Sequence, residues 1–548
     1  MMSQNEMKTI IDYLKGAFTY LLVVFLIVTL YTELSHYWST IGSVRGDLVK
    51  FEIPLVLLLL FIVYFPTINN RIIRYLFPTI PILVLYLSVD VFYGFLGRSP
   101  RPSDFQNINM VSDFSVGLMF LILLLVFLIC FPVIMLFYKA YQNCSFKDMV
   151  YSVSFRMLSV FLVLFVFLSD TFADYHASSY QYAEWSQEKS IKENGRFSSF
   201  MFYGYQEKKS FALLDEYGKK NIDIKKILFP DTVRHPRNIH IVVLESFIDP
   251  RLLLNISFNR SPLANELTPY LLSASNNFSH VISPVYGGTT AQAEFELLTG
   301  IHAFAKIGSV EFNILQGGKT NGFVGALNQN GYKSIATLAT GSGYYNSVSA
   351  YKSLGFDDVL FLAESGMITD KEKERGVSDA GLLKHSLSRI KNALNTATQP
   401  IVSYTLGMYG HFPYERDLSD EPDIINSDHQ DERVKRISNQ FYYRTKAVAN
   451  FIKQLTAIDS SSIIYITSDH VPPLLDNNIH YGLDRHENIS LFISDGHAVD
   501  VSGKRYYEIP WLIWDELTGL KSARSLSDKD REELYFKLLS ESIQFGNH

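Results

Sequence analysis

The strongest constraint on this chain is a series of five long apolar stretches in its first third. Residues 16–32, 53–68 and 114–138 contain no charged side chain, and residues 75–97 and 151–172 contain few. A helix needs roughly 20 apolar residues to cross a bilayer, and modest tilting or snorkelling accommodates the shorter stretches. Residues 1–173 are therefore expected to form five transmembrane helices. A cleaved signal peptide fits less well, because four more apolar stretches follow the first one.

The distribution of lysine and arginine predicts how these helices are oriented. With the N-terminus in the cytoplasm, seven of these basic residues lie in cytoplasmic segments and four lie in outer loops. An excess of basic residues marks the cytoplasmic side. Five spans then place everything after Asp174 outside the cytoplasm, so we expect a multi-pass protein of the cytoplasmic membrane with a large extracytoplasmic region.

Charge and cysteine content limit what this outer region can be. The net charge of −6 comes without a basic tail, which gives no support for nucleic-acid binding. The two cysteines, Cys130 and Cys144, lie within or just after an apolar stretch. The outer region is therefore expected to fold without disulfides, although cysteine usage alone does not fix its compartment.

The polar remainder of the chain divides into three parts. Residues 174–237 are irregular and are expected to be a juxtamembrane linker, with one or two short helices in 210–228. Residues 238–520 alternate between short β-branched runs and helical segments, which favours an α/β domain with a mostly parallel sheet. Residues 521–548 are charged and are expected to form a C-terminal tail with a peripheral helix.

The strands and helices of the α/β domain can be placed approximately. Predicted strands are 239–244, 334–338, 401–406 and 463–467, and predicted helices are 291–298, 378–394 and 436–455. In such sheets, ligands bind at the carboxyl ends of the strands.

Acidic residues follow two of the predicted strands. The run IHIVVL leads directly into Glu245, and IIYITS leads into Asp469 and His470. Carboxylates and an imidazole at one sheet edge are suited to a divalent cation. Each acid alone is equally compatible with a turn or a helix cap, so a third element is needed.

The third element is the segment GGTTAQAEFE, residues 287–296. Its two glycines allow the backbone to approach a ligand, and a helix is expected to begin directly afterwards. Thr289 and Gln292 fit a capping box, and Gly300 fits the helix stop. Thr290 would lie in the first turn, where free N–H groups and the helix dipole favour a phosphate. An ordinary Gly-rich turn with a cap is the alternative.

Five motifs, in this order, carry a resemblance to a known family: LESF (244–247), GGTTAQAEFE (287–296), YKSLGFDD (351–358), GHFPY (410–414) and SDH (468–470). Together they are similar to the lipoteichoic acid synthase family, sulfatase-like phosphotransferases of the alkaline phosphatase superfamily. Five membrane helices, a linker and an outer α/β domain also match, so the resemblance covers nearly the whole chain. It implies an extracytoplasmic sulfatase-like domain at 238–520.

The resemblance implies roles for the residues that match its motifs. Thr290 aligns with the nucleophile that becomes phosphorylated, and Thr289 is its nearest rival. Glu245, Asp469 and His470 align with the residues that hold one divalent metal together with that threonine. The metal is usually Mn²⁺, and the mixed ligand set also suits Mg²⁺ or Zn²⁺.

Substrate contacts are implied at three further positions, with one departure from the family. His411 aligns with a histidine that contacts the phosphate or headgroup, with a simple turn histidine as the alternative. Tyr345 and Asn346 correspond to a substrate-binding Trp-Asn-Arg segment, but Ser347 replaces its arginine. The headgroup or the residue that grips it therefore differs in this chain.

The implied reaction moves a phosphoglycerol-type headgroup from a membrane phospholipid, with phosphatidylglycerol expected, to a cell-envelope glycan or polymer. Phosphoethanolamine transfer is the enzymatic alternative, although those enzymes tend to carry disulfides in the outer domain. A non-catalytic lipid- or glycan-binding protein is the alternative of another class. Sulfate-ester hydrolysis is disfavoured, because the only similar cysteine motif, at Cys130, lacks the arginine.

Three charged residues near the membrane remain without a role. Asp90 lies within the apolar stretch 75–97, and an acid inside a span is either functional or paired with a base such as Arg98 or Arg101. Arg98 and Arg101 themselves fit either lipid-phosphate attraction or simple interfacial anchoring.

Overall fold

The computed structural model describes residues 4–35, 80–96, 169–183 and 187–544, apart from 305, 308–309, 343, 370–371, 373–375, 475–478 and 522–523. Four isolated positions, 41, 43, 127 and 131, are also described. The chain separates into two compact units, Met1–Ser210 and Phe211–His548, here called the N-terminal and the C-terminal unit.

The described part of the N-terminal unit is helical. Its elements are α1 (Gln4–Ser35), α5 (Ile80–Leu96), α8 (Asp170–Ser179), α9 (Gln187–Asn194) and the first part of α10 (Arg196–Gly218). Within the described residues, α1 is the one helix long and apolar enough to cross a membrane, through its segment Phe18–Ser35, and α5 is a shorter apolar helix. The other predicted spans, 53–68, 114–138 and most of 151–172, lie outside the described residues, so the five-helix arrangement stays a prediction.

Asp90 has a partner that differs from the one expected. Its carboxylate lies 2.7 Å from Arg196 Nε and 3.0 Å from Arg196 Nη2, and it accepts a hydrogen bond of 2.8 Å from the Tyr31 hydroxyl. Both side chains of the ion pair are fully buried. Arg98 and Arg101 lie outside the described residues. A base more than a hundred positions along the chain therefore pairs with Asp90, which proximity in sequence does not reveal.

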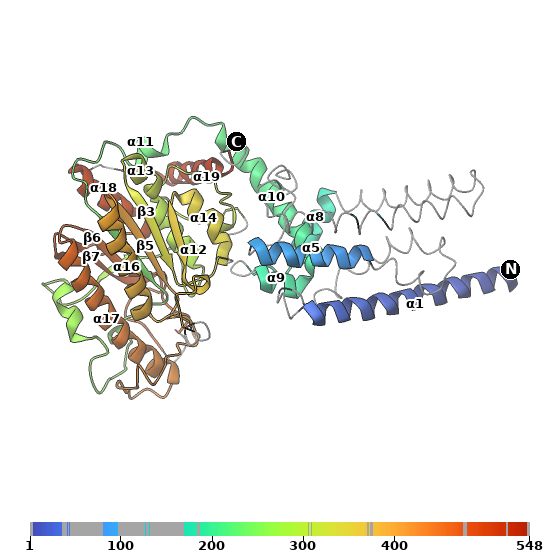
Figure 1. The fold of residues 1–548 in the computed structure, drawn as a ribbon, viewed down its shortest axis with the longest axis horizontal. Coiled ribbons are helices and arrows are strands. Elements are labelled where there is room, and N and C mark those ends of the chain that lie inside the picture. Colours follow the sequence, from blue (N-terminus) through green and yellow to red (C-terminus); the bar gives the residue numbers. More distant parts are fainter. Residues whose placement is uncertain are drawn as a thin grey trace. The chain divides into compact units, whose positions relative to one another are not determined.

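The C-terminal unit is built around a single eight-stranded sheet with the order β2-β7-β6-β1-β5-β3-β4, and β8 pairs with β7 (Figure 1). The strands are β1 (Ile239–Leu244), β2 (Ser279–Ile282), β3 (Lys333–Leu338), β4 (Asp358–Phe361), β5 (Ile401–Gly407), β6 (Ile463–Ser468), β7 (Glu487–Ser494) and β8 (His497–Val499). The five strands from β6 to β4 run parallel, and β7 is antiparallel to β6, β2 and β8. The predicted mostly parallel sheet is confirmed.

Helices cover both faces of this sheet (Figure 1). The α-helices of this unit, besides the end of α10, are α11 (Ile224–Leu228), α12 (Thr290–Thr299), α13 (Phe323–Gln329), α14 (Ser347–Leu354), α16 (Asp379–Thr396), α17 (Glu432–Ile458), α18 (Ile509–Thr518) and α19 (Asp528–Gln544), within the described residues. Short 3₁₀ segments are η5 (Pro250–Leu252), η6 (Asn265–Tyr270), η7 (Glu311–Asn313), η8 (Tyr344–Asn346), η9 (Leu362–Glu364) and η10 (Tyr506–Glu508).

The strand residues alternate between two hydrophobic cores. In β1, Ile241 and Val243 pack into the core that contains α12, α13, α14, α18 and α19, whereas Val242 and Leu244 pack into the core that contains α16 and α17. Successive side chains of a strand point to opposite faces, so a strand buried on both sides reads as a continuous apolar run. This is why IHIVVL shows no polar alternation although both faces are covered.

The predicted elements of this unit were located well, and the C-terminal segment was not. The four predicted strands correspond to β1, β3, β5 and β6, and the predicted helices correspond to α12, α16 and α17. The helix expected after residue 521 exists as α19, but it is not peripheral, because Leu534, Tyr535, Leu538 and Leu539 are buried in the main core. The prediction was wrong because it rested on the charged residues of α19, whereas the apolar residues of the same helix are buried. The domain boundaries at 173, 237 and 520 stay predictions.

Candidate active site

Two neighbouring strands deliver the predicted metal ligands to one edge of the sheet. Strands β1 and β6 are parallel and in register, with Leu244 opposite Ser468. Glu245 follows the last residue of β1, and Asp469 and His470 follow the last residue of β6. Because the strands end level with each other, the side chains that follow them lie side by side at the carboxyl edge, where ligands bind in such sheets.

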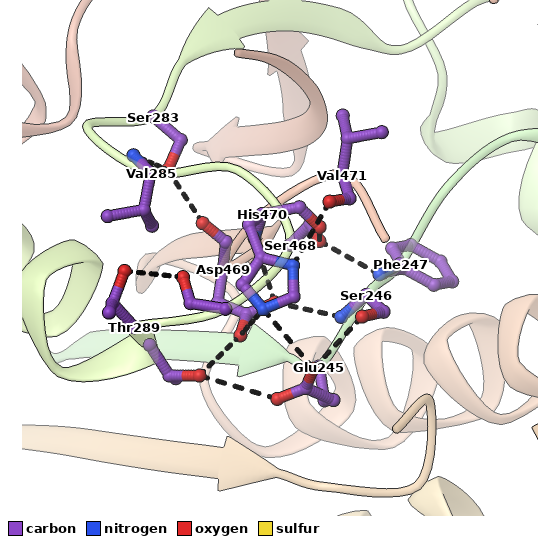
Figure 2. Close-up of polar contacts among 12 residues, drawn as sticks. Glu245, Ser246, Phe247, Ser283, Val285, Thr289, Ser468, Asp469, His470 and Val471 are labelled. Carbon is purple, nitrogen blue, oxygen red and sulfur yellow. Dashed lines mark hydrogen bonds and ion pairs between the residues drawn. The ribbon is translucent and has the colours of Figure 1, made fainter. Parts of the chain in front are cut away.

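The three side chains form a compact, buried group. His470 Nε2 lies 3.4 Å from Glu245 Oε1 and 3.2 Å from Asp469 Oδ2. One potential ligand atom from each residue lies within 4.8 Å of the others, and all three residues are at most 2% exposed. Figure 2 shows the three side chains pointing toward one another.

Thr290 completes this group from a different part of the chain. It is the first residue of α12, and its Oγ1 donates to Asp469 Oδ2 at 2.8 Å, with Glu245 Oε2 at 3.4 Å. The structure thus brings together all four residues that the sequence predicted for nucleophile and metal, although up to 225 positions separate them, from Glu245 to His470. Their catalytic roles stay predictions.

The turn before Thr290 is strained, and it does not form the predicted capping box. Gly287, Gly288 and Thr289 all have positive φ, at 70°, 153° and 60°. A β-branched residue such as Thr289 rarely adopts this conformation, and strain of this kind is typical of functional sites. Thr289 Oγ1 donates to the carbonyl oxygen of Gly288 at 2.6 Å and does not cap the helix. The expected cap was wrong because capping requires an extended backbone, whereas Thr289 is left-handed.

The two carboxyl groups of the site, Glu245 and Asp469, make it suitable for binding a divalent cation. Burial raises the pKa of Glu245 well above its ordinary value, and the nearby charge of Asp469 raises it further. Arg444 lies close, but its Nη2 bonds the main-chain carbonyl of Glu245 at 2.8 Å and its Nε bonds Asp379 at 2.5 Å. Two adjacent buried acids without an arginine or lysine of their own are unfavourable unless a proton or a metal compensates them. The donor set of two carboxylates, an imidazole and a hydroxyl suits Mn²⁺, Mg²⁺ or Zn²⁺.

Main-chain groups hold the ligands in place. Asp469 Oδ1 accepts from the backbone N–H groups of Ser246 and His470, each at 2.8 Å, which leaves Oδ2 facing the site. Ser246 Oγ donates to Glu245 Oε1 at 2.9 Å. His470 Nδ1 lies 3.2 Å from the Val471 carbonyl oxygen. A proton on Nδ1 would satisfy that contact and leave the Nε2 lone pair for a metal.

The three residues predicted to bind substrate have different environments. His411 is exposed, and its Nδ1 lies 2.8 Å from the Phe412 carbonyl oxygen. Tyr345 is buried, and burial raises its pKa, with a further contribution from the charges of Glu245 and Asp469. Asn346 uses its amide N–H groups to bond the carbonyl oxygens of Phe312 and Leu315 at 3.0 and 2.9 Å. Their contacts with substrate stay predictions.

A close backbone approach explains the glycine in the GHFPY segment. A side chain at Gly410 would lie 1.9 Å from the carbonyl oxygen of Glu245 and 2.4 Å from Arg444 Nη1. Only glycine therefore fits between the loop after β5 and the end of β1. This packing sets the loop that carries His411 beside the metal ligands.

Sequence reasoning missed three residues of this region. Arg444 supports Glu245 from within the buried face of α17, between Phe441 and Val448. Its position on an apolar stripe was a usable signal, because an arginine there must have a buried partner. Glu294 belonged to a recognised motif but was given no role. Tyr344 lies beside Thr290 and Glu245: burial raises its pKa, the charge of Glu245 adds to this, and a hydrogen bond with the Thr290 side chain acts in the opposite direction.

A cleft of about 940 Å³ is partly lined by the loop after β5, which also carries His411. Its lining includes Tyr409, Tyr414, Arg416, Lys435 and Arg436, together with several acidic side chains. Tyr409 directly precedes the glycine that contacts the Glu245 carbonyl, but the four residues of the candidate site do not line the cleft.

Comparison with protein families identifies the fold family of the C-terminal unit. Residues 237–531, more than half of the 548 residues, match the model described as Sulfatase. The chain belongs to the sulfatase family. The sulfatase-like α/β domain and the superfamily inferred from the motifs are thereby confirmed.

Two curated proteins are similar to part of this chain. The "Putative cyclic beta-1,2-glucan modification protein" of Rhizobium meliloti is 25% identical over 305 residues, 55% of this chain and 45% of that protein. The "Lipoteichoic acid synthase-like YvgJ" of Bacillus subtilis is 22% identical over 284 residues, 50% of this chain and 42% of that protein. The chain therefore spans less than half the length of either relative.

The chain is also similar to a solved structure. It is the Streptococcus pyogenes phosphoglycerol transferase GacH in complex with sn-glycerol-1-phosphate, at 17% identity and a TM-score of 0.41. The match covers 62% of this chain and 93% of that one.

Proposed function

We propose that this protein is a membrane-anchored, metal-dependent phosphotransferase. It moves a phosphoglycerol-type headgroup from a membrane phospholipid onto a cell-envelope glycan or polymer, through a phosphothreonine intermediate at Thr290. Membership of the sulfatase family supports the general class of chemistry. The name of that family does not define the reaction, because this chain lacks the motif that sulfate-ester hydrolysis requires.

The observation that carries the proposal is the hydroxyl of Thr290 between two buried carboxylates. It lies at the N-terminus of a ten-residue helix and within hydrogen-bonding distance of Asp469. Helix N-termini favour phosphate, because free N–H groups and the helix dipole point at it. A buried threonine hydroxyl that is needed only for packing does not require two acids beside it.

Each residue of the group has a definable task. A divalent cation held by Glu245, Asp469, His470 and Thr290 would lower the pKa of the threonine hydroxyl and stabilise negative charge on the phosphate. Asp469 and Glu245 orient the hydroxyl through the contacts at 2.8 and 3.4 Å. Their burial, at 0% and 2% exposure, excludes water that would compete as a nucleophile.

The proposed reaction is a double displacement. Thr290 Oγ1 attacks the phosphorus of the lipid phosphodiester, the bond from phosphorus to the diacylglycerol oxygen breaks, and that oxygen gains a proton to replace the one lost by the threonine. An acceptor hydroxyl then attacks the phosphothreonine diester and loses its proton, while Thr290 Oγ1 regains one. The headgroup phosphate ends on the acceptor, and the enzyme returns to its initial state.

Membrane attachment supports a lipid donor. Helix α1 is long and apolar enough to cross a bilayer, and Phe18, Leu26 and Leu30 on it are more than half exposed in the isolated chain. A lipid donor is confined to the membrane surface, so tethering the enzyme there raises its effective concentration. The multi-pass arrangement and the extracytoplasmic side remain part of the proposal.

A glycan acceptor is supported by two observations. The name of the Rhizobium meliloti relative refers to glucan modification. The cleft that includes Tyr409, the residue before Gly410, is lined by hydrogen-bonding side chains and has a volume suited to several sugar units.

The donor assay tests the proposal most simply. Purified protein with Mn²⁺ is incubated with fluorescent phosphatidylglycerol or fluorescent phosphatidylethanolamine in mixed micelles. We expect fluorescent diacylglycerol from phosphatidylglycerol and none with Thr290→Ala. Diacylglycerol from phosphatidylethanolamine alone would assign the enzyme to phosphoethanolamine transfer.

Absence of product from both lipids, together with absence of Mn²⁺ binding by calorimetry, would favour a non-catalytic binding protein. Product formation at the wild-type rate by Thr290→Ala would remove the proposed nucleophile.

A further inference from the structure

The carboxyl group of Glu294 is buried one helical turn beyond Thr290. Both residues belong to α12, four positions apart, so they lie on the same side of the helix. Glu294 is 1% exposed, and its Oε1 accepts hydrogen bonds from two tyrosine hydroxyls, Tyr351 and Tyr404. The contact with Tyr404 measures 2.8 Å. A carboxylate in such surroundings is unfavourable unless it is bonded, so the three residues form a structural unit.

This unit joins three segments that reach the active site separately. Glu294 belongs to the helix that begins with Thr290. Tyr351 belongs to α14, which directly follows the turn with Tyr344 and Tyr345. Tyr404 belongs to β5, the strand that leads into the His411 loop.

The strand on which Tyr404 lies is fixed to the strand of the first metal ligand. Tyr404 is the register partner of Ile241 in β1, and Glu245 directly follows the last residue of β1. The hydrogen bond from Tyr404 to Glu294 therefore connects α12 directly with the centre of the sheet. It ties the start of the helix to the strand whose end carries Glu245.

The contact also joins two of the motifs found in the sequence. Glu294 lies in GGTTAQAEFE and Tyr351 in YKSLGFDD, which are separated by more than fifty residues. In the fold the two motifs meet at this hydrogen bond.

Thr290 needs an anchor other than its own hydrogen bonds. In the structure its hydroxyl is held by Asp469 and Glu245. These carboxylates must serve a cation and a changing phosphate during the proposed reaction, so they cannot alone fix the position of the helix. A misplacement of a reacting group by about 1 Å lowers rates by about a hundredfold.

We propose that Glu294, held by the hydroxyls of Tyr351 and Tyr404, is a positioning residue that fixes the Thr290 hydroxyl against Glu245 and Asp469. This inference rests on the proposed function for its catalytic consequence, but not for its effect on metal binding. Glu294 itself touches neither substrate nor metal in this account.

The same core provides a matched control. The Tyr535 hydroxyl donates to the buried carboxylate of Glu311 at 3.0 Å, and Tyr535 packs against Phe295 of the same helix α12. Tyr535→Phe therefore removes a hydrogen bond of the same type, near the same helix, away from its first turn. A loss that reflects only general loosening of the core would appear equally in this control.

The experiment compares full-length Tyr351→Phe/Tyr404→Phe with Tyr535→Phe, in detergent and with Mn²⁺. For the double variant we expect kcat to fall about 10- to 100-fold with KM changed by less than about threefold. The control is expected to keep kcat within about twofold. Glu294→Gln retains an acceptor for both tyrosines, so it should keep most of the activity that Glu294→Ala loses.

Metal titration gives a readout without substrate. Because Thr290 is an expected ligand, we expect the Mn²⁺ dissociation constant of the double variant to rise about tenfold, toward that of Thr290→Ala, while Tyr535→Phe remains unchanged. If the double variant does not fold, Tyr404→Phe alone is measured in the same way. A folded variant with wild-type kcat and Mn²⁺ affinity, or equal losses in the control, would overturn the proposal.

Failure of the two proposals can be told apart. If the wild type releases no diacylglycerol from any lipid, the transferase function is wrong, and the Mn²⁺ titration alone decides the role of Glu294. If the wild type is active and Thr290→Ala is inactive, but the double variant matches the wild type, only the positioning role is wrong.

Discussion

The two units of this protein each bury acidic side chains, but Asp90 of the N-terminal unit is paired with an arginine side chain, whereas Glu245 and Asp469 of the C-terminal unit are not. In the N-terminal unit, Asp90 receives two hydrogen bonds from Arg196, at 2.7 and 3.0 Å, and a third from Tyr31. In the C-terminal unit, Glu245 and Asp469 lie beside each other with a threonine and a histidine, and their nearest arginine bonds the main chain.

This difference separates a structural charge from a functional one. A buried acid with a bidentate arginine has its charge compensated within the fold, so it needs no ligand. Two adjacent buried acids without such a partner favour protonation or a bound cation. Burial of a carboxylate alone therefore does not indicate function; two buried carboxylates that share one imidazole and have no arginine or lysine of their own do.

The largest effect should come from the hydroxyl at the centre of the uncompensated group. Thr290→Ala is expected to lower turnover at least about a thousandfold, because no other nucleophile replaces it. Thr289→Ala is the neighbouring control and should stay within about tenfold. Diacylglycerol release from fluorescent phosphatidylglycerol measures both. Equal loss in the two variants would show that the turn matters rather than the Thr290 hydroxyl.

Removal of the metal should next distinguish the buried acids of the C-terminal unit from Asp90 in the N-terminal unit. Treatment with a chelator is expected to abolish turnover, and Mn²⁺ should restore it. At a free concentration of about 100 times Kd, Mn²⁺ should stabilise the folded protein by about 2.7 kcal/mol, measured as a rise in melting temperature.

In Glu245→Gln/Asp469→Asn the metal-dependent rise should disappear, whereas Asp90→Asn should retain it. A rise that survives in the double variant would place the metal elsewhere.

Breaking the compensated pair should affect stability without affecting chemistry. Arg196→Ala leaves Asp90 buried and unpaired, which is expected to destabilise the N-terminal unit by about 3–5 kcal/mol. The kcat and the Mn²⁺ affinity of protein that remains folded should stay at wild-type values. Arg196→Met/Asp90→Leu replaces both charges and should recover most of the stability. Loss of Mn²⁺ affinity in folded Arg196→Ala would contradict the division between the two kinds of buried acid.

A further prediction concerns the dependence of stability on pH. Burial raises the pKa of Glu294 from 4.5 to about 7, with hydrogen bonds from Tyr351 and Tyr404 acting in the opposite direction. The folded protein therefore holds this proton more tightly than the unfolded chain, and its stability should fall as pH rises from about 4.5 to 7, by roughly 3 kcal/mol at most.

Glu294→Gln isolates this contribution. The melting temperature of the metal-free variant in detergent should fall less between pH 5 and 8 than that of the wild type. Identical slopes would show that Glu294 does not titrate in this range.

The sequence predicted most of the parallel strands of the sheet, but not all of its strands. Strands β1, β3, β5 and β6 were found because each is a short β-branched run buried on both faces. Strand β7 was missed, although its burial is almost complete, because the polar residues Asn488, Ser490 and Ser494 interrupt its apolar pattern.

The ligands were found because acids directly follow two strands of a parallel sheet. Glu245, Asp469 and His470 could be grouped without a structure once their strands were assumed to be neighbours, and the register of β1 with β6 supplies the reason. The partner of Asp90 could not be found in this way, because no pattern links a residue in α5 with Arg196 in a different helix.

The positioning contacts required three-dimensional information. Tyr404 lies on a strand that the sequence did place, whereas the helix α14 that carries Tyr351 was not predicted. The direction of each hydroxyl depends on how α12, α14 and β5 pack. The conformation of Thr289 was also beyond the sequence, because a β-branched residue at positive φ goes against local preference and depends on its surroundings.

The central claim is that the Thr290 hydroxyl takes the headgroup phosphate from a lipid. Its most direct test is mass spectrometry of the peptide that contains residues 287–296, after a brief incubation of the protein with Mn²⁺ and phosphatidylglycerol in the absence of acceptor. We expect a headgroup phosphate on Thr290 that is absent without Mn²⁺. Release of diacylglycerol while this peptide stays unmodified, or carries the phosphate on Thr289, would contradict the account.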